Sequence, residues 1–223
     1  SALSSDFDDM LLSQEMEQLA CTIAAGEHSV LLHGLPGTGK SMFAERLPSI
    51  WPSICGGEHI ESLRAYSIAA FHIPTSLLGG RPPFRDPHHQ ASASAIIGTA
   101  EQPGELSLAH GGILFLDEFC EFRRDIIEAL REPLESGRVH VARARKKATW
   151  HARVTLVAAC NPCPCGWYGS SKKQCVCPLA RVLAYKRKLS GPILDRIDCH
   201  FAMPDVGDSA NSLFQTLPKS SGK

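Results

Sequence analysis

The 223-residue chain has no acidic residue between positions 136 and 194, a stretch that carries 12 lysines and arginines. Residues 1–135 have the opposite bias, with 19 acidic and 8 basic residues, so the formal net charge of zero averages two unlike parts. A long block of one charge indicates either a polyanionic partner or pairing with the acidic part inside the fold. The charges alone leave both interpretations open.

Long apolar runs are also missing. No segment approaches the roughly 20 apolar residues that a membrane-spanning helix needs, and the first residues, Ser1 to Asp6, lack the pattern of a secretory signal. We therefore expect a cytoplasmic protein with no membrane partner. Hydrophobic residues make up 43% of the chain, enough for a packed core, and internal repeats are absent.

Short apolar runs alternate with amphipathic segments. The patterns predict strands at 29–33, 113–116 and 154–159, and helices at 13–25, 39–47, 125–135 and 179–189, with Pro48 expected to end the second helix. Continuous apolar strands separated by helices are typical of a parallel sheet covered on both faces, so we expect an α/β fold. Two stretches interrupt the pattern. Residues 79–112 are rich in Gly, Pro and His, and residues 137–153 alternate around a basic tip, which predicts a β-hairpin.

A phosphate-binding motif follows the first predicted strand. It consists of Gly34, Leu35, Pro36, Gly37, Thr38, Gly39, Lys40 and Ser41, and matches G-x-x-x-x-G-K-[ST]. In such a loop, glycines let backbone N–H groups surround phosphates, the lysine reaches the β- and γ-phosphates, and the Ser hydroxyl binds Mg²⁺. The alternative is a glycine-rich turn without a ligand, which the strand before and the helix after the motif disfavour.

Polar residues end the other two predicted strands. Asp117 and Glu118 follow the second, where a carboxylate suits Mg²⁺ and the next suits orienting water. Asn161 follows the third, at the sheet edge where ligands lie. Many strands end in acids, and an Asn before a proline such as Pro162 is also common where a chain simply turns. These residues therefore indicate a nucleotide site only in combination with the phosphate-binding motif.

Four of the nine cysteines cluster in one loop: Cys163, Cys165, Cys175 and Cys177. Four thiolates can complete a tetrahedral Zn²⁺ site, although the Cys-x-Cys spacing is tighter than usual. Disulfides and plain surface thiols remain alternatives. The other five cysteines are scattered and are interpreted as small core residues.

Several motifs occur together in an order that resembles one family. The phosphate-binding loop, Asp-Glu strand, strand-terminal Asn and a later Leu-Asp-Arg are similar to AAA+ ATPases. Four further segments resemble the ComM/YifB family in particular: 81–89, 103–110, 161–166 and 190–198. This family comprises bacterial relatives of the magnesium chelatase I subunit and belongs to the helix-2-insert clade of AAA+ ATPases. The resemblance covers residues 6–205.

The resemblance implies roles for individual residues. Lys40 and Ser41 match the Walker A pair, Asp117 and Glu118 the Walker B pair, Asn161 sensor 1, and Arg196 an arginine finger that acts on a neighbour's nucleotide. It also implies ATP, Mg²⁺ and, at the four clustered cysteines, a structural Zn²⁺. The expected layout is a core at 1–205, with an insertion at 79–110, a hairpin at 137–153 and a zinc loop at 162–178, followed by a polar, mobile tail at 206–223.

The family works as ATP-driven hexameric rings, and ComM proteins are implicated in branch migration of DNA during natural transformation. The resemblance thus implies an ATPase whose partners are DNA, single-stranded or branched, and further copies of the chain. The hairpin residues expected to contact DNA are Arg143, Arg145, Lys146 and Lys147. The alternatives are chelatase-type remodelling and MoxR-like remodelling of a protein client without DNA binding.

The resemblance has departures. Ser13-Gln14 stands where the family has Gly-Gln, and neither the Lon-like N-terminal domain nor the C-terminal helical lid has a counterpart in this sequence. We therefore expect the core of a longer protein, with weak or no ATP turnover alone. His88 and His89 are interpreted as shaping the insertion rather than as a second metal site. Arg81 and Arg85 suit either nucleic acid or the next subunit, and Trp150, Trp167 and Tyr168 suit either core packing or base stacking.

Overall fold

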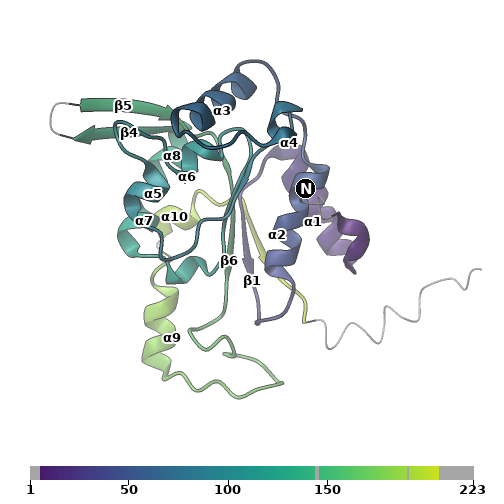
Figure 1. The fold of residues 1–223 in the computed structure, drawn as a ribbon. Coiled ribbons are helices and arrows are strands. Elements are labelled where there is room, and N and C mark those ends of the chain that lie inside the picture. Colours follow the sequence, from purple (N-terminus) through teal and green to yellow (C-terminus); the bar gives the residue numbers. More distant parts are fainter. Residues whose placement is uncertain (1–5, 144–145, 190, 206–223) are drawn as a thin grey trace, which may run out of the picture.

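The computed structural model describes residues 6–143, 146–189 and 191–205 (Figure 1). The predictions for Arg145 and for the tail at 206–223 lie outside these residues, as does the side chain of Arg143. The centre is a five-stranded sheet in the order β2-β3-β6-β1-β7, in which every neighbouring pair is parallel. The strands are β1 (Val30–His33), β2 (Phe84–Arg85), β3 (Ile113–Leu116), β6 (Thr155–Cys160) and β7 (Cys199–Ala202). The predicted α/β fold with a central parallel sheet is confirmed.

Helices cover both faces of this sheet. They are η1 (Phe7–Asp9), α1 (Gln14–Gly26), α2 (Lys40–Ile50), α3 (Gly56–Ile68), α4 (Thr75–Leu78), α5 (Ala93–Ile97), α6 (Glu105–Leu108), η2 (Phe119–Glu121), α7 (Arg124–Ala129), α8 (Arg131–Ser136), α9 (Leu179–Lys186) and α10 (Gly191–Leu194). In Figure 1, α1 and α2 lie on one side of the sheet, and α5, α7 and α10 on the other. Because successive strand residues face opposite sides, Leu31 packs in one apolar cluster and Val30 and Leu32 in the other. Both faces are buried, which explains the continuous apolar strands.

Two helix predictions need correction, and both concern proline. The helix expected to stop at Pro48 runs on to Ile50. Pro48 lies in its last turn, where the missing N–H removes a single hydrogen bond. The helix expected over 125–135 is divided into α7 and α8 at Leu130. Pro133 has no N–H for the carbonyl of Ala129, so the ladder breaks where α7 ends.

The insertion contains structure of its own. It holds β2, α5 and α6, and Ile96 and Leu106 within it are fully buried against the sheet. The hairpin is confirmed as β4 (Arg138–Arg143) and β5 (Lys146–His151), paired antiparallel from Arg138↔His151 to Arg143↔Lys146. It projects away from the central sheet (Figure 1). Within the described ranges, no helix combines the length and apolar character needed to cross a membrane.

Candidate nucleotide site and cysteine cluster

The phosphate-binding motif forms the loop between β1 and α2, as the sequence predicts. Gly37 and Gly39 have φ values of +79° and +84°, a region that favours glycine, so the backbone can turn tightly into the helix. The Gly34 N–H donates to the carbonyl of Cys160 at 3.3 Å, which ties the loop to the end of β6. The loop therefore opens an 11-residue helix at the carboxyl edge of the sheet.

Lys40 lies inside this loop, with 8% of its surface exposed. Its ammonium donates to the carbonyls of Gly34 and Leu35, at 2.9 and 2.8 Å. Burial lowers the pKa of Lys40, while the nearby Asp117 and Cys160 oppose that shift. The loop thus holds a positive charge at its centre, where phosphate oxygens can replace the carbonyls as its partners.

The end of β3 brings an acid to the start of α2. The Ser41 hydroxyl donates to Asp117 Oδ2 at 2.6 Å, and the backbone N–H of Glu118 donates to Asp117 Oδ1 at 2.8 Å. A hydroxyl and a carboxylate in contact are hard oxygen donors of the kind that Mg²⁺ prefers, so these residues fit that ion. The two residues that the sequence predicts as Mg²⁺ ligands are therefore neighbours in the fold.

Glu118 has an unusual backbone, with φ at +50°, although it is not glycine. Such strained positions cluster at functional sites. Its carboxylate Oε2 lies 3.0 Å from Nδ1 of His89, a contact that sequence reasoning missed. No pattern could have indicated it, because the insertion and the strand end meet only once the chain has folded.

Asn161 lies at the same edge. It follows β6, whose Cys160 pairs with His33 of β1 and whose Ala158 pairs with Leu116 of β3. The end of β6 thus lies between the phosphate-binding loop and the acidic pair, as expected for the carboxyl ends of parallel strands.

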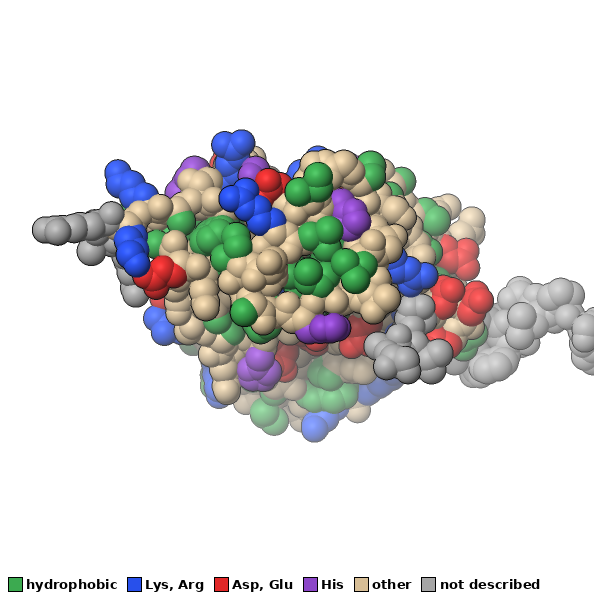
Figure 2. Space-filling model, turned by 45° about the horizontal axis from the view of Figure 1, so that its top comes forward, with side chains coloured by type: hydrophobic (Ala, Val, Ile, Leu, Met, Phe, Trp, Pro, Cys, Tyr) green, Lys and Arg blue, Asp and Glu red, His purple; other side chains and the backbone are tan. Residues whose placement is uncertain are grey.

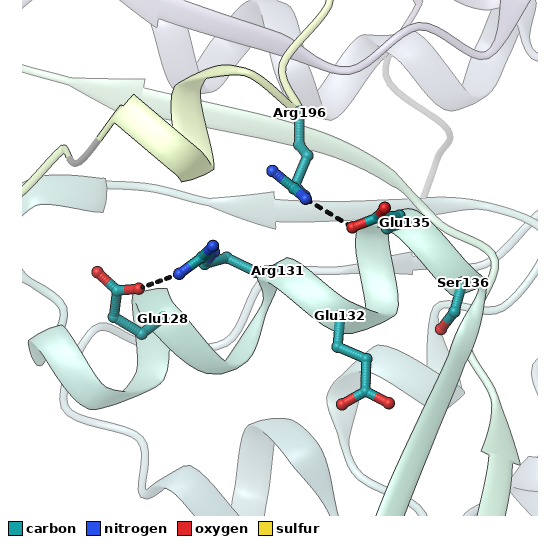
Figure 3. A pocket seen from close by; sticks show the side chains of 6 residues that line it. All are labelled: Glu128, Arg131, Glu132, Glu135, Ser136 and Arg196. Atoms are coloured by element: carbon teal, nitrogen blue, oxygen red, sulfur yellow. Dashed lines mark hydrogen bonds and ion pairs between the residues drawn. The ribbon is translucent and has the colours of Figure 1, made fainter.

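Arg196 lies apart from this cluster of residues. Its guanidinium donates to Glu135 Oε2 at 2.6 Å and to the Pro192 carbonyl at 2.8 Å. Figure 3 shows it beside Arg131 in an open hollow of about 480 Å³ lined also by glutamates of α7 and α8. Among the described residues, the Nε atoms of both arginines are buried without a hydrogen-bond partner. The partners of Arg196 within the chain are thus on α8 and α10, not on the phosphate-binding loop.

The four clustered cysteines converge, with their sulfurs within 4.8 Å of one another. The Cys163 sulfur lies 3.4 Å from that of Cys165 and 3.7 Å from that of Cys175. A disulfide requires about 2.05 Å, whereas zinc bonds of about 2.3 Å in a tetrahedron separate the sulfurs by about 3.8 Å. The backbone N–H of Trp167 also lowers the pKa of Cys165 to about 6. The donor set fits Zn²⁺ and does not fit disulfides.

The cysteine loop touches the phosphate-binding loop. Gly166 follows Cys165 with φ at +84°, and a Cβ built on it would lie 2.4 Å from Cγ of Pro36. Only a glycine allows the two loops to approach so closely. The two loops follow the neighbouring strands β1 and β6, but their contact depends on how the loops pack beyond the sheet, so sequence reasoning missed it.

The structure gives contacts within the chain for Arg85 and Trp150, two of the residues left open by the sequence. Arg85 forms a two-pronged ion pair with Glu105, at 2.6 and 2.8 Å, so it holds the insertion together. The Trp150 indole donates to the Thr99 carbonyl at 2.8 Å, which anchors the hairpin to the insertion. In the part of the chain that the structure describes, the four cysteines form the one group of three or more potential ligands close enough for a metal. The histidine pair accordingly has no third ligand there.

Both interpretations of the basic block have support. Arg153 pairs with Glu27 and Glu58 at 2.9 and 2.6 Å, and Lys146 pairs with Glu101 at 2.5 Å, so part of the block does neutralise the acidic part. Lys147 is exposed on the hairpin. Figure 2 shows Lys and Arg side chains around the hairpin end of the molecule and acidic side chains gathered at the other end.

The parallel sheet, the loop between β1 and α2 and the acids after β3 together define a protein with the AAA+ ATPase fold. NtrX from Brucella abortus, solved with ADP, superposes with a TM-score of 0.56 at 15% identity, over 93% of this chain and 41% of that one, which shows the shared fold. The chain belongs to the family described as magnesium chelatase, subunit ChlI, whose profile matches residues 6–211.

Relatives place the chain more closely within that family. It is 42% identical over 205 residues to the uncharacterized protein YifB of Escherichia coli, covering 91% of this chain and 40% of that protein. It is 41% identical over 201 residues to the competence protein ComM of Haemophilus influenzae, covering 89% and 39%. The Drosophila melanogaster DNA replication licensing factor Mcm6 is 29% identical over 82% of this chain and 19% of its own. The chain thus spans about 40% of the length of YifB and ComM, and the resemblance to the ComM/YifB family is confirmed.

Proposed function

We propose that the chain is the ATP-binding and ATP-hydrolysing core of a ComM-like DNA motor that assembles into a hexameric ring and drives branch migration. The observation that carries the proposal is the 2.6 Å contact between Ser41 and Asp117, which joins the two halves of an ATP site. In this proposal residues 1–205 are the motor core, with the insertion at 79–110, the hairpin at 137–153 and the zinc loop at 162–178.

The placement of the side chains supports a mechanism of hydrolysis. The backbone N–H groups of residues 34–41 and the Lys40 ammonium bind the phosphates of ATP. Ser41 and Asp117 would hold Mg²⁺, which would supply positive charge beside the phosphates of ATP. Glu118 orients a water and takes its proton as the water oxygen bonds to the γ-phosphorus and the bond to the ADP oxygen breaks. Asn161 hydrogen-bonds the γ-phosphate or that water.

Arg196 acts on the nucleotide of a neighbouring copy. Its contacts with Glu135 and Pro192 lie on elements away from the phosphate-binding loop, which supports a role across a subunit boundary. There the guanidinium stabilises the charge that develops in the transition state. The site is then complete only in the ring.

The hairpin contacts the DNA backbone. Its candidates are Arg143, Arg145, Lys146 and Lys147, and their contacts to phosphates predict strong salt dependence and little sequence preference. The names of the relatives, a competence protein and a DNA replication licensing factor, support a nucleic-acid partner for this family branch. Cys163, Cys165, Cys175 and Cys177 would hold Zn²⁺, which would supply a structural cross-link in the loop they share.

A DNA-binding measurement tests the proposal. It uses single-stranded and four-way-junction DNA at two salt concentrations, with and without a non-hydrolysable ATP analogue. We expect salt-sensitive binding that strengthens with nucleotide, and loss of the nucleotide effect in Lys40→Ala. Nucleotide binding without DNA binding in any condition would favour the alternative, chelatase-type or MoxR-like remodelling of a protein client.

A further inference from the structure

The side chain of His89, in the insertion, contacts Glu118, the second acid after β3. Nδ1 of His89 lies 3.0 Å from Oε2 of Glu118. The backbone of Glu118 is fixed by its hydrogen bond to Asp117, but its side chain is 50% exposed and has its own freedom of rotation. The contact with His89 is therefore what sets the direction of the carboxylate.

His89 is itself held firmly. Its side chain is 24% exposed, and its ring meets the fully buried Phe122 edge-on, with centroids 6.4 Å apart. The ring of His88 lies against it at 4.1 Å. The backbone N–H of Gln90 donates to Nδ1 of His88 at 3.2 Å, which closes the local turn. The His89 imidazole is thus held by its ring contacts, whereas the carboxylate of Glu118 is half exposed.

We propose that His89 is a positioning residue for ATP hydrolysis. The proposal rests on the proposed role of Glu118 as the base. The contact of His89 Nδ1 with Oε2 holds that oxygen and leaves Oε1 to accept from the attacking water. Because His89 belongs to the insertion, any movement of the insertion turns the base toward or away from that water. The insertion thereby sets the rate of hydrolysis without touching ATP.

Substitutions separate positioning from structure. His89→Ala should lower kcat by about tenfold, since orientation is part of the 10²–10⁴-fold that a base contributes, while KM for ATP changes by less than about twofold. His89→Asn should restore most of the rate, because its amide nitrogen occupies nearly the place of Nδ1 in the contact with Oε2. His72→Ala, at an exposed histidine outside the insertion, is the control, with an expected change in kcat below about twofold. Equal rates in His89→Ala and His72→Ala would overturn the proposal.

Single turnovers of radiolabelled ATP with protein in excess detect slow hydrolysis. Glu118→Gln should abolish turnover, and adding His89→Ala to it should change nothing further. Turnover by Glu118→Gln at the wild-type rate would contradict the proposed base, whereas loss in Glu118→Gln with a normal rate in His89→Ala would contradict only the role of His89.

The histidine contact also has a readout that needs no turnover. In protein labelled with ¹⁵N-histidine, Glu118→Gln should shift the Nδ1 resonance of His89. It should leave in place that of His110, which precedes β3 whereas Glu118 follows it. An unchanged His89 resonance would show that the two side chains do not interact in solution and would overturn the proposal whatever the hydrolysis rate.

Discussion

His110 is a buried histidine that links stability to pH. It is 4% exposed, and its Nδ1 accepts a hydrogen bond from the backbone N–H of Arg153 at 3.1 Å. Burial lowers its pKa, with a further lowering from the charge of His151. Since the unfolded chain binds a proton near pH 6.5 and the folded chain resists it, this contribution to stability is present above about pH 6.5 and is lost as the pH falls.

Urea unfolding at pH 7.5 and 5.5 measures this effect. The wild-type free energy of unfolding should fall between the two values by more than that of His110→Asn, which removes the titrating group and keeps an acceptor. His28→Asn, at an exposed histidine, is the control and should behave as the wild type. Equal losses in all three proteins would contradict the assignment to His110.

At the scale of residues, the structure brings the predicted residues Ser41 and Asp117 into contact, and the prediction of these residues depended on fixed local spacing. Lys40 and Ser41 lie within one short motif, and Asp117 ends a buried strand of the same parallel sheet, separated from β1 by β6. The contacts of Glu118 with His89 and of Pro36 with Gly166 were not predictable. Each joins residues that are remote along the chain, and each depends on how loops outside the sheet pack.

At the scale of elements, the cysteine loop should support the phosphate-binding loop. Gly166 packs on Pro36, so fixing the cysteine loop with Zn²⁺ also fixes one wall of the nucleotide site. We expect Cys175→Ser to lower both the zinc content and the melting temperature, and to weaken binding of a fluorescent ATP analogue by about three- to tenfold. Cys21→Ser, at an exposed cysteine outside the loop, is the control.

Two results separate the parts of that prediction. Wild-type nucleotide affinity in zinc-free protein would show that the loops are not coupled. A zinc content near zero in the reconstituted wild-type protein, measured by elemental analysis, would show that the four cysteines do not bind zinc.

The elements that were not predicted from the sequence share one property, the lack of a clear hydrophobic pattern. Strand β2 has two residues and β7 alternates between half-buried and exposed positions, so neither gives the continuous apolar run that identified β1, β3 and β6. Helix α3 has a weak apolar face, with Ile60 exposed and its three buried residues all in its second half. The hairpin was predictable because apolar and polar residues alternate on both sides of a basic tip, a pattern typical of two paired strands.

At the scale of the whole molecule, the basic block of the sequence divides into two surfaces. Figure 1 places the β4–β5 hairpin at one end and the cysteine loop with α9 at the other. On the hairpin, Lys146 already pairs with Glu101 while Lys147 is exposed. We expect Lys147→Ala to weaken DNA binding uniformly across sequences and to reduce the salt slope by about one, and Lys146→Ala to do less.

A filter-binding titration over several salt concentrations measures that slope. Lys173→Ala serves as the matched control, because it removes one exposed lysine from the cysteine loop, where it lies 5.3 Å over the Trp167 ring. If Lys173→Ala lowers the slope and Lys147→Ala does not, the DNA runs along the cysteine-loop end instead of the hairpin.

The final prediction concerns the assembly and follows from where Arg196 lies. If each site takes Glu118 from one copy and Arg196 from its neighbour, then Arg196→Ala and Glu118→Gln proteins should each be inactive alone. Mixed together, they form some boundaries in which an intact Glu118 meets an intact Arg196, so ATP hydrolysis should reappear and rise with protein concentration. Glu135→Ala, which removes the ion-pair partner of Arg196, is the control and should keep the activity of the unmixed wild type. Mixtures that stay inactive at concentrations where the wild type is active would place both residues in the site of a single copy.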